Sequence, residues 1–343
     1  MNSTISQRKI YTIVLVTIYI AFMFVKFTFG ELTPDEILFT NDSEIDTSNV
    51  IYIWFNFIFS FLYRIGKFFL PLINITFIFY LFNRLYLKEV IQKKSLSKNV
   101  LLLLFILPSV IYFTSAYLRD IYVYILTLVL TFNSNVFRSW KKVFLILILI
   151  FFLRIELFLV LVLSLGVDYI LTYKKRPFIF VNRFTIPIII LCSWLILIGL
   201  FSFDFIWEFT DFFISRYEIS KPYYGIMQVS ITKANVISGS LLNWFAFYVP
   251  FLFKKITAPF DYFILLDSII ICFLFIRFFI KFKSSEFKIN KLYRLCFYTF
   301  MISFFIALPE SLPETMFRHR MAYIPFLIYL NYGKLTTINL KLN

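Results

Sequence analysis

A cluster of carboxylates follows the first strongly apolar segment of the chain. Six of the nineteen acidic residues lie within residues 31–46: Glu31, Asp35, Glu36, Asp42, Glu44 and Asp46. Asp35 and Glu36 follow Thr33-Pro34, and a carboxylate at such a position could act as a general base that takes a proton from a hydroxyl group. The same four residues also fit a helix start, with Thr33 as N-cap, Pro34 at the first helical position and Glu36 completing a capping box. The two interpretations are compatible, because a cap can hold a neighbouring carboxylate rigid, and both remain open.

Side chains that could bind phosphate occur at three further places. These are the pair Arg119-Asp120, the isolated Arg154, and the cluster Arg318-His319-Arg320. Arginine is always charged and can donate hydrogen bonds to two phosphate oxygens at once, so it can offset the charge that develops on a phosphate leaving group. Each place also has a structural interpretation. Arg119-Asp120 could be an ion pair at a helix start, and Arg154 could snorkel or line a cavity. Arg318-His319-Arg320 could be a basic rim that contacts lipid phosphates.

The sequence gives little support to a metal centre. His319 is the only histidine, and the three cysteines lie in apolar segments without the spacing of a zinc site. Carboxylates would suit Mg²⁺ or Mn²⁺, which prefer oxygen ligands, but nothing in the sequence fixes a ligand set, so no cofactor is assigned.

The composition identifies the class of protein. Sixty-one per cent of the residues are hydrophobic, only 15% are charged, and the mean hydropathy is +0.84. A soluble domain has about a quarter of its residues charged, so this chain is an integral membrane protein. The net charge of +15 does not point to nucleic acid, because the basic residues lie mostly in short clusters between apolar segments, as the positive-inside rule requires.

We expect an all-α fold: a polytopic helix bundle forming a single transmembrane domain over 1–343, with about ten membrane-spanning helices. The expected spans are 10–30, 68–87, 99–113, 121–134, 184–203, 260–280, 294–308 and 321–333. The stretch 143–172 is interpreted as two short helices that turn near Arg154, with one long tilted helix as the alternative. The distribution of lysine and arginine places both termini in the cytoplasm. It also makes 31–67 the first outer loop and 204–259 a large outer loop. Within these loops, 51–66 and 241–253 are expected to lie on the membrane surface.

The predicted topology places charged residues of four separate segments on the same side of the membrane. The acidic stretch, Arg119-Asp120, Arg154 and the cluster 318–320 all fall on the outer face. Charges that converge from separate segments favour a polar cavity there.

The layout resembles the GT-C class of membrane glycosyltransferases, in which the first outer loop carries the catalytic carboxylate. Asp35-Glu36 follows the first membrane helix and precedes an interfacial helix and a second span. The segments LPSVIYFTSAYLRDIYVYIL (107–126), FLRIELFLVLVL (152–163) and FRHRMAYIPFLIYL (317–330) also resemble bacterial membrane glycosyltransferases and Wzy-type polysaccharide polymerases.

This resemblance implies an enzyme of surface polysaccharide synthesis, of the O-antigen or capsule kind, in the bacterial inner membrane. It implies a polyprenyl-phosphate-linked sugar donor, a glycan or lipid-linked acceptor, and an active site on the outer face. Asp35 or Glu36 would activate the acceptor hydroxyl, while the substrate phosphate would be held by Arg119, Arg154, Arg318, His319 and Arg320.

Two alternatives remain open. A Wzy-like polymerase would join whole lipid-linked repeat units and rely more on arginines than on a carboxylate. A lipid-linked oligosaccharide flippase or transporter belongs to another class; against it, the chain shows no internal repeat and has only seven glycines.

Overall fold

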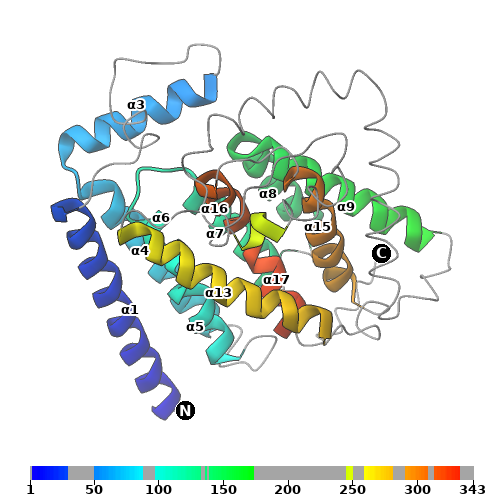
Figure 1. Cartoon of the computed structure of the whole chain (residues 1–343), viewed down its shortest axis with the longest axis horizontal. Coiled ribbons are helices and arrows are strands. Elements are labelled where there is room, and N and C mark those ends of the chain that lie inside the picture. Colours follow the sequence, from blue (N-terminus) through cyan, green and yellow to red (C-terminus); the bar gives the residue numbers. More distant parts are fainter. Residues whose placement is uncertain are drawn as a thin grey trace. The chain divides into compact units, whose positions relative to one another are not determined.

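The computed structural model describes residues 2–29, 50–87, 97–132, 136, 139–173, 245–249, 259–280, 290–307 and 313–332. These residues form helices and short connections and contain no strand, so the predicted all-α class is confirmed for them (Figure 1). The chain divides into two compact units, Met1–Ile155 and Glu156–Asn343, which are described separately. The GT-C-like arrangement and the single transmembrane domain over 1–343 stay predictions.

Seven helices make up the described part of unit 1. They are α1 (Asn2–Phe29), α3 (Val50–Ile65), α4 (Phe69–Leu85), α5 (Lys98–Ile106), α6 (Pro108–Thr114), α7 (Asp120–Phe132) and α8 (Trp140–Leu153). Helix α4 packs against α1, α3, α5, α6 and α7, and α7 packs against α8. Every residue of α6 is buried, so this short helix lies inside the unit.

The helix ends in unit 1 follow from local chemistry. The Ser97 side chain accepts a hydrogen bond from the Val100 N–H at the start of α5. Leu107 has extended backbone and separates α5 from α6, because the residue before a proline avoids the helical region and Pro108 suits the first helical position. Arg154 is also extended (φ −154°, ψ 93°) and ends α8. The predicted break near Arg154 is therefore confirmed, whereas the expected span 99–113 is two short helices.

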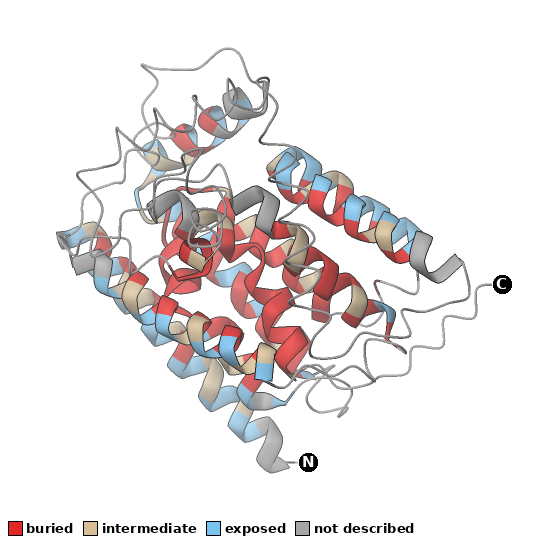
Figure 2. Cartoon of the chain, turned by 45° about the vertical axis from the view of Figure 1, so that its right-hand side comes forward, coloured by how far each residue is buried: buried red, intermediate tan, exposed pale blue. Residues whose placement is uncertain are grey.

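Unit 2 contains four described helices besides α9 (Ile155–Tyr173), which begins at the boundary of the two units. They are α13 (Pro259–Ile280), α15 (Lys291–Ala307), α16 (Pro313–Met321) and α17 (Ile324–Tyr332). Helix α17 packs against α13, α15 and α16 and is buried along nearly all its length; Figure 2 marks buried residues in red. Nine residues of helix span only about 14 Å, less than half of a hydrocarbon core of about 30 Å, so α17 does not cross a membrane alone.

The Asn290 side chain connects the start of α15 to α17. Its Oδ1 atom accepts hydrogen bonds from the N–H groups of Leu292 and Tyr293, at 3.0 and 3.2 Å, and so caps α15. Its Nδ2 atom donates to the Tyr329 hydroxyl of α17 at 3.2 Å. A single side chain thus satisfies two amides at a helix end and joins two helices.

Within the described residues, two helical segments are long and apolar enough to cross a membrane, Ser6–Thr28 and Tyr262–Ile280. A third span is counted if Asn56–Ile65 and Phe69–Leu85, bent by 105°, are taken together. Both segments carry exposed large apolar side chains, among them Ile13, Phe24, Ile269 and Phe273, as lipid-facing helices do. These apolar helices support a membrane protein. The total of about ten spans, the orientation and the interfacial position of 51–66 stay predictions, and 184–203 and most of 204–259 lie outside the described residues.

Candidate functional site

Four separate parts of unit 1 meet at one end of it. Lys67, in the turn between α3 and α4, donates to the Phe27 carbonyl oxygen of α1 at 3.2 Å, and the Tyr117 hydroxyl donates to the Lys67 carbonyl oxygen at 3.2 Å. Arg154, after α8, pairs with Asp120 at the start of α7. We call this region the polar end of unit 1, made of Lys26, Lys67, Arg119, Asp120 and Arg154. The contacts bring Lys67 close to Tyr117 and Arg154 close to Asp120, whereas the shared outer-face position of 31–67, 114–120, 154 and 318–320 stays a prediction.

The ion pair between Asp120 and Arg154 joins α7 to the end of α8. Asp120 is the first residue of α7, where a carboxylate is stabilised by the positive end of the helix dipole. The side chains are only 3% and 9% exposed. Arg154 therefore has a partner 34 residues away in sequence rather than its near neighbour Glu156. Its assignment to substrate phosphate stays a prediction, since Asp120 already matches part of its charge.

Arg119 lies immediately before α7 and is partly buried. Its carbonyl oxygen accepts hydrogen bonds from the N–H groups of Tyr122 and Val123, at 3.1 and 3.4 Å, so its backbone begins the helix. Asp35 and Glu36 lie outside the described residues. They belong to the segment that joins Phe29 of α1 to Val50 of α3.

Sequence reasoning missed Lys26. This lysine lies in the last turn of α1 and is only 7% exposed. Its Nζ atom lies 3.5 Å from the Ser115 carbonyl oxygen, at the end of α6, and 4.6 Å from the centre of the Tyr112 ring. A helix C-terminus carries partial negative charge, and an aromatic face attracts a cation. The signal was present in the sequence, because a lysine inside an apolar run is costly unless the fold gives it partners.

In unit 2, Arg318, His319 and Arg320 lie on α16 and differ in their surroundings. Arg318 and His319 are partly exposed, whereas Arg320 is fully buried. Burial lowers the pKa of Arg318 and of Arg320 to about 10, so both guanidinium groups stay protonated at neutral pH.

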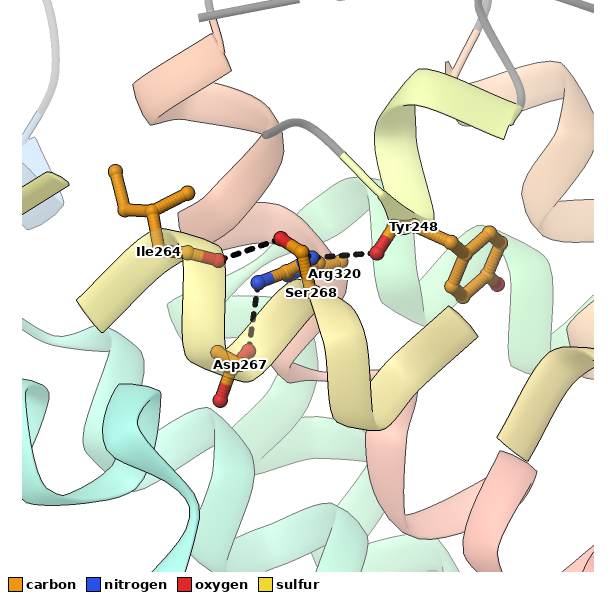
Figure 3. A network of polar contacts seen from close by, with 5 residues as sticks. All are labelled: Tyr248, Ile264, Asp267, Ser268 and Arg320. Atoms are coloured by element: carbon orange, nitrogen blue, oxygen red, sulfur yellow. Dashed lines mark hydrogen bonds and ion pairs between the residues drawn. The ribbon is translucent and has the colours of Figure 1, made fainter. Parts of the chain in front are cut away.

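Arg320 is the centre of a buried polar network (Figure 3). Its Nη2 atom donates to Asp267 Oδ2 at 2.6 Å, and its Nη1 atom donates to Ser268 Oγ at 3.1 Å and to the Tyr248 carbonyl oxygen. The Ser268 hydroxyl in turn donates to the Ile264 carbonyl oxygen at 2.6 Å. The network joins α16 to α13 and to the short helical segment 245–248. The prediction that Arg320 binds substrate phosphate would require this network to open first.

Asp267 was also missed by sequence reasoning. It lies within the apolar segment Tyr262–Ile280, five residues after its first residue, which is about 7.5 Å along a helix axis. An acidic residue at such a depth indicates a buried partner, although the sequence does not say which one. A second ion pair in unit 2 follows the same rule: Arg294 of α15 donates to Asp168 of α9 at 2.6 Å.

Among the residues that the structure describes, no group of three or more histidine, cysteine, aspartate or glutamate side chains could hold a metal ion. Comparison of the chain with protein-family profiles, with curated proteins and with solved structures finds no match. The described helices, the polar end of unit 1 and the Arg320 network therefore define a class: an all-helical membrane protein with cations at helix ends.

Proposed function

We propose that this protein is a membrane glycosyltransferase that uses a polyprenyl-phosphate-linked sugar in the synthesis of a bacterial surface polysaccharide. The observation that carries the proposal is the polar end of unit 1, where Lys26, Lys67, Arg119 and Arg154 gather at the end of an apolar helix bundle. Among the five described residues that define this region, four are basic and Asp120 is acidic. A donor with an anionic phosphate on a long apolar chain matches this arrangement, with the phosphate near the cations and the chain in the lipid.

The expected reaction is a direct displacement at the anomeric carbon of the sugar. Asp35 or Glu36 takes the proton of the acceptor hydroxyl, whose oxygen forms a bond to the anomeric carbon. The bond from that carbon to the phosphate oxygen breaks, and the polyprenyl phosphate leaves with the bonding electrons. Arg119 and Lys26 offset the charge on the departing phosphate.

The chain connection between the predicted base and the described cations suits this proposal. Asp35 follows Phe29 by six residues, and six residues of chain reach at most about 22 Å. Phe27, two residues before the end of α1, accepts the hydrogen bond from Lys67. The carboxylates are therefore tethered to the region where the cations lie. By the same proposal the site opens to the outer face of the inner membrane, with both termini cytoplasmic.

A polymerase version of this chemistry is favoured by the second group of cations. Arg318 and His319 of unit 2 are partly exposed and would suit a pyrophosphate carrier or a second lipid-linked substrate. The products separate the two versions. A transferase adds one sugar per acceptor, whereas a polymerase yields a ladder of repeat units.

The flippase alternative is favoured by the interrupted helices. Helices α5 and α6 are separated at Leu107, and α16 and α17 at Ala322–Tyr323, and transporters often place substrate at such breaks. A flippase would move the lipid-linked sugar across the bilayer and leave the bond between sugar and phosphate intact.

The test uses purified protein in nanodiscs with polyprenyl-phosphate-linked sugars and a panel of acceptors, and it measures release of polyprenyl phosphate. Wild type and the exposed-surface control Lys141→Ala are expected to be active. Asp35→Asn or Glu36→Gln, and Arg119→Ala, are expected to lose most of the activity. The same variants are expected to fail to restore surface glycan in a deletion strain at matched expression. Transfer of the intact lipid across vesicles without release of polyprenyl phosphate would overturn the proposal in favour of a flippase.

A further inference from the structure

Two polar side chains of helix α3, Asn56 and Ser60, face the protein, whereas its exposed face is mostly apolar. Asn56, Phe59 and Ser60 are 5%, 2% and 3% exposed, and they share one helix face because they are three and four residues apart. The other face carries exposed large apolar side chains: Trp54, Phe57, Ile58, Phe61 and Ile65. This is the reverse of an amphipathic helix on a soluble protein. It suits a helix that is surrounded by lipid and covers a polar region.

The inner face of α3 packs against Tyr117, two residues before Arg119 of the polar end of unit 1. The rings of Phe59 and Tyr63 lie 6.3 and 5.3 Å from the ring of Tyr117, both edge to face. The Tyr117 hydroxyl donates to the Gly66 and Lys67 carbonyl oxygens just after α3. Tyr117 is two residues before Arg119, so α3 packs directly on the segment that carries the candidate phosphate ligand.

Asn56 lies on this inner face, one turn before Phe59. Its side-chain Oδ1 atom is buried and has no hydrogen-bond partner in the part of the chain that the structure describes. Asn74 of α4 provides the contrast: it is also buried, donates to the Thr114 carbonyl oxygen at 3.2 Å and accepts from the Tyr122 hydroxyl at 2.9 Å. Buried polar atoms without partners are rare, because each costs stability. An oxygen of this kind, on the helix face that packs on Tyr117, suits a donor group that a ligand brings.

We propose that Asn56 is a substrate-binding residue, whose Oδ1 atom accepts a hydrogen bond from a hydroxyl group of the sugar on the polyprenyl phosphate. The inference rests on the proposed function, since it assigns a role within the same site. The phosphate lies against Lys26 and Arg119, and the sugar lies beneath α3. An amide oxygen accepts hydrogen bonds from hydroxyl or N–H groups and repels anions. Asn56 therefore recognises the sugar, whereas the cations bind the phosphate.

The first measurement is stability. Asn56→Leu replaces the amide by an apolar group of similar size, so it removes an unsatisfied acceptor and leaves the unfolding temperature unchanged or higher. Asn74→Leu is the matched control. It breaks two hydrogen bonds and is expected to lower the unfolding temperature by several degrees. A comparable fall in the Asn56→Leu variant would show that Oδ1 has a structural partner and would overturn the proposal.

The second measurement is binding in nanodiscs. The probes are undecaprenyl phosphate alone and undecaprenyl phosphates that carry glucose, galactose, mannose or N-acetylglucosamine. Wild type is expected to bind at least one glycosylated carrier more tightly than the bare phosphate. Asn56→Leu is expected to lose about three- to tenfold in affinity for that carrier, the worth of one neutral hydrogen bond, and none for the bare phosphate. Arg119→Ala is expected to weaken both.

The outcomes separate the two proposals. If Asn56→Leu keeps the preference for the glycosylated carrier while Arg119→Ala weakens both lipids, the role of Asn56 is overturned and the proposed function stands. If wild type binds none of these lipids, the proposed function fails, and the role of Asn56 fails with it.

Discussion

Removing one charge from the ion pair between Asp267 and Arg320 should destabilise the protein strongly. Both side chains are 0% exposed, and their charged atoms are 2.6 Å apart. Asp267→Asn keeps the size of the side chain and removes its charge, so the Arg320 guanidinium is left in the interior without a counter-charge. Arg320→Gln leaves the Asp267 carboxylate in the same condition.

The magnitude follows from the burial of the pair. Breaking a buried ion pair by removing one partner costs about 3–5 kcal/mol, because the remaining charge stays desolvated. For a unit of this size, a loss of 1 kcal/mol in the free energy of unfolding lowers the unfolding temperature by roughly 2–4 °C. Each single variant is therefore expected to unfold at a temperature about 6–20 °C lower than wild type. The double variant Asp267→Leu/Arg320→Met should recover most of this loss, since it removes both charges. It does not recover all of it, because the Tyr248 carbonyl oxygen loses its donor.

The assay can use a thiol that the protein already has. Cys296 of α15 is fully buried, so with Cys192 and Cys272 replaced by serine a thiol-reactive fluorophore reports its exposure as the protein unfolds in detergent or nanodiscs. Lys141→Gln, an exposed position on α8, is the control and should leave the unfolding temperature unchanged. The reasoning would be refuted if Asp267→Asn behaved like this control. It would also be refuted if the double variant lost as much stability as the two single variants together.

Three further predictions follow from the same contacts. Asp120→Asn should lower the unfolding temperature by several degrees, because it leaves the buried Arg154 without a counter-charge. The double variant Asp120→Asn/Arg154→Gln should lower it by less, because no unmatched charge remains, and equal losses in the two variants would contradict the ion pair. Tyr19→Phe should cost about 1–3 kcal/mol in thermal unfolding, since the buried hydroxyl donates to the Phe105 carbonyl oxygen at 2.7 Å, and an unchanged temperature would contradict this bond. In a cysteine-free background, a water-soluble maleimide should label Ser97→Cys but not Ile13→Cys or Phe273→Cys in intact membranes; rapid labelling of Ile13→Cys would contradict α1 as a span.

The helices that the sequence predicted well are those with a long apolar run or a clear interruption. The runs 10–30, 68–87 and 260–280 correspond to α1, α4 and α13, and the arginine within 143–172 marks the end of α8. The break at Leu107 could have been predicted as well, because Pro108 restricts the residue before it. It was missed because hydropathy alone treats 99–113 as one apolar stretch.

Partners distant in sequence could not be predicted in the same way. Asp267 and Arg320 are 53 residues apart, and Asp120 and Arg154 are 34 apart. Charge in an apolar segment indicates that a partner exists, whereas its identity depends on how the helices pack. The alternation of spans placed Asp120 and Arg154 on the same predicted side, which is compatible with their ion pair, but it did not identify them as partners. For α3, composition shows an aromatic-rich helix but does not tell which face meets the protein, so the inward position of Asn56 was missed.

The arginines of the two units have different relations to the fold, and this difference determines how a loss of activity should be interpreted. Arg320 is fully buried and donates to three groups of unit 2, so any loss of activity in Arg320→Gln should come with a lower unfolding temperature. Arg119 is partly exposed and begins α7 through its backbone, which Arg119→Ala preserves. Loss of activity in Arg119→Ala at an unchanged unfolding temperature would therefore be evidence for contact with substrate. The same loss in Arg320→Gln would be evidence only that unit 2 needs its buried network.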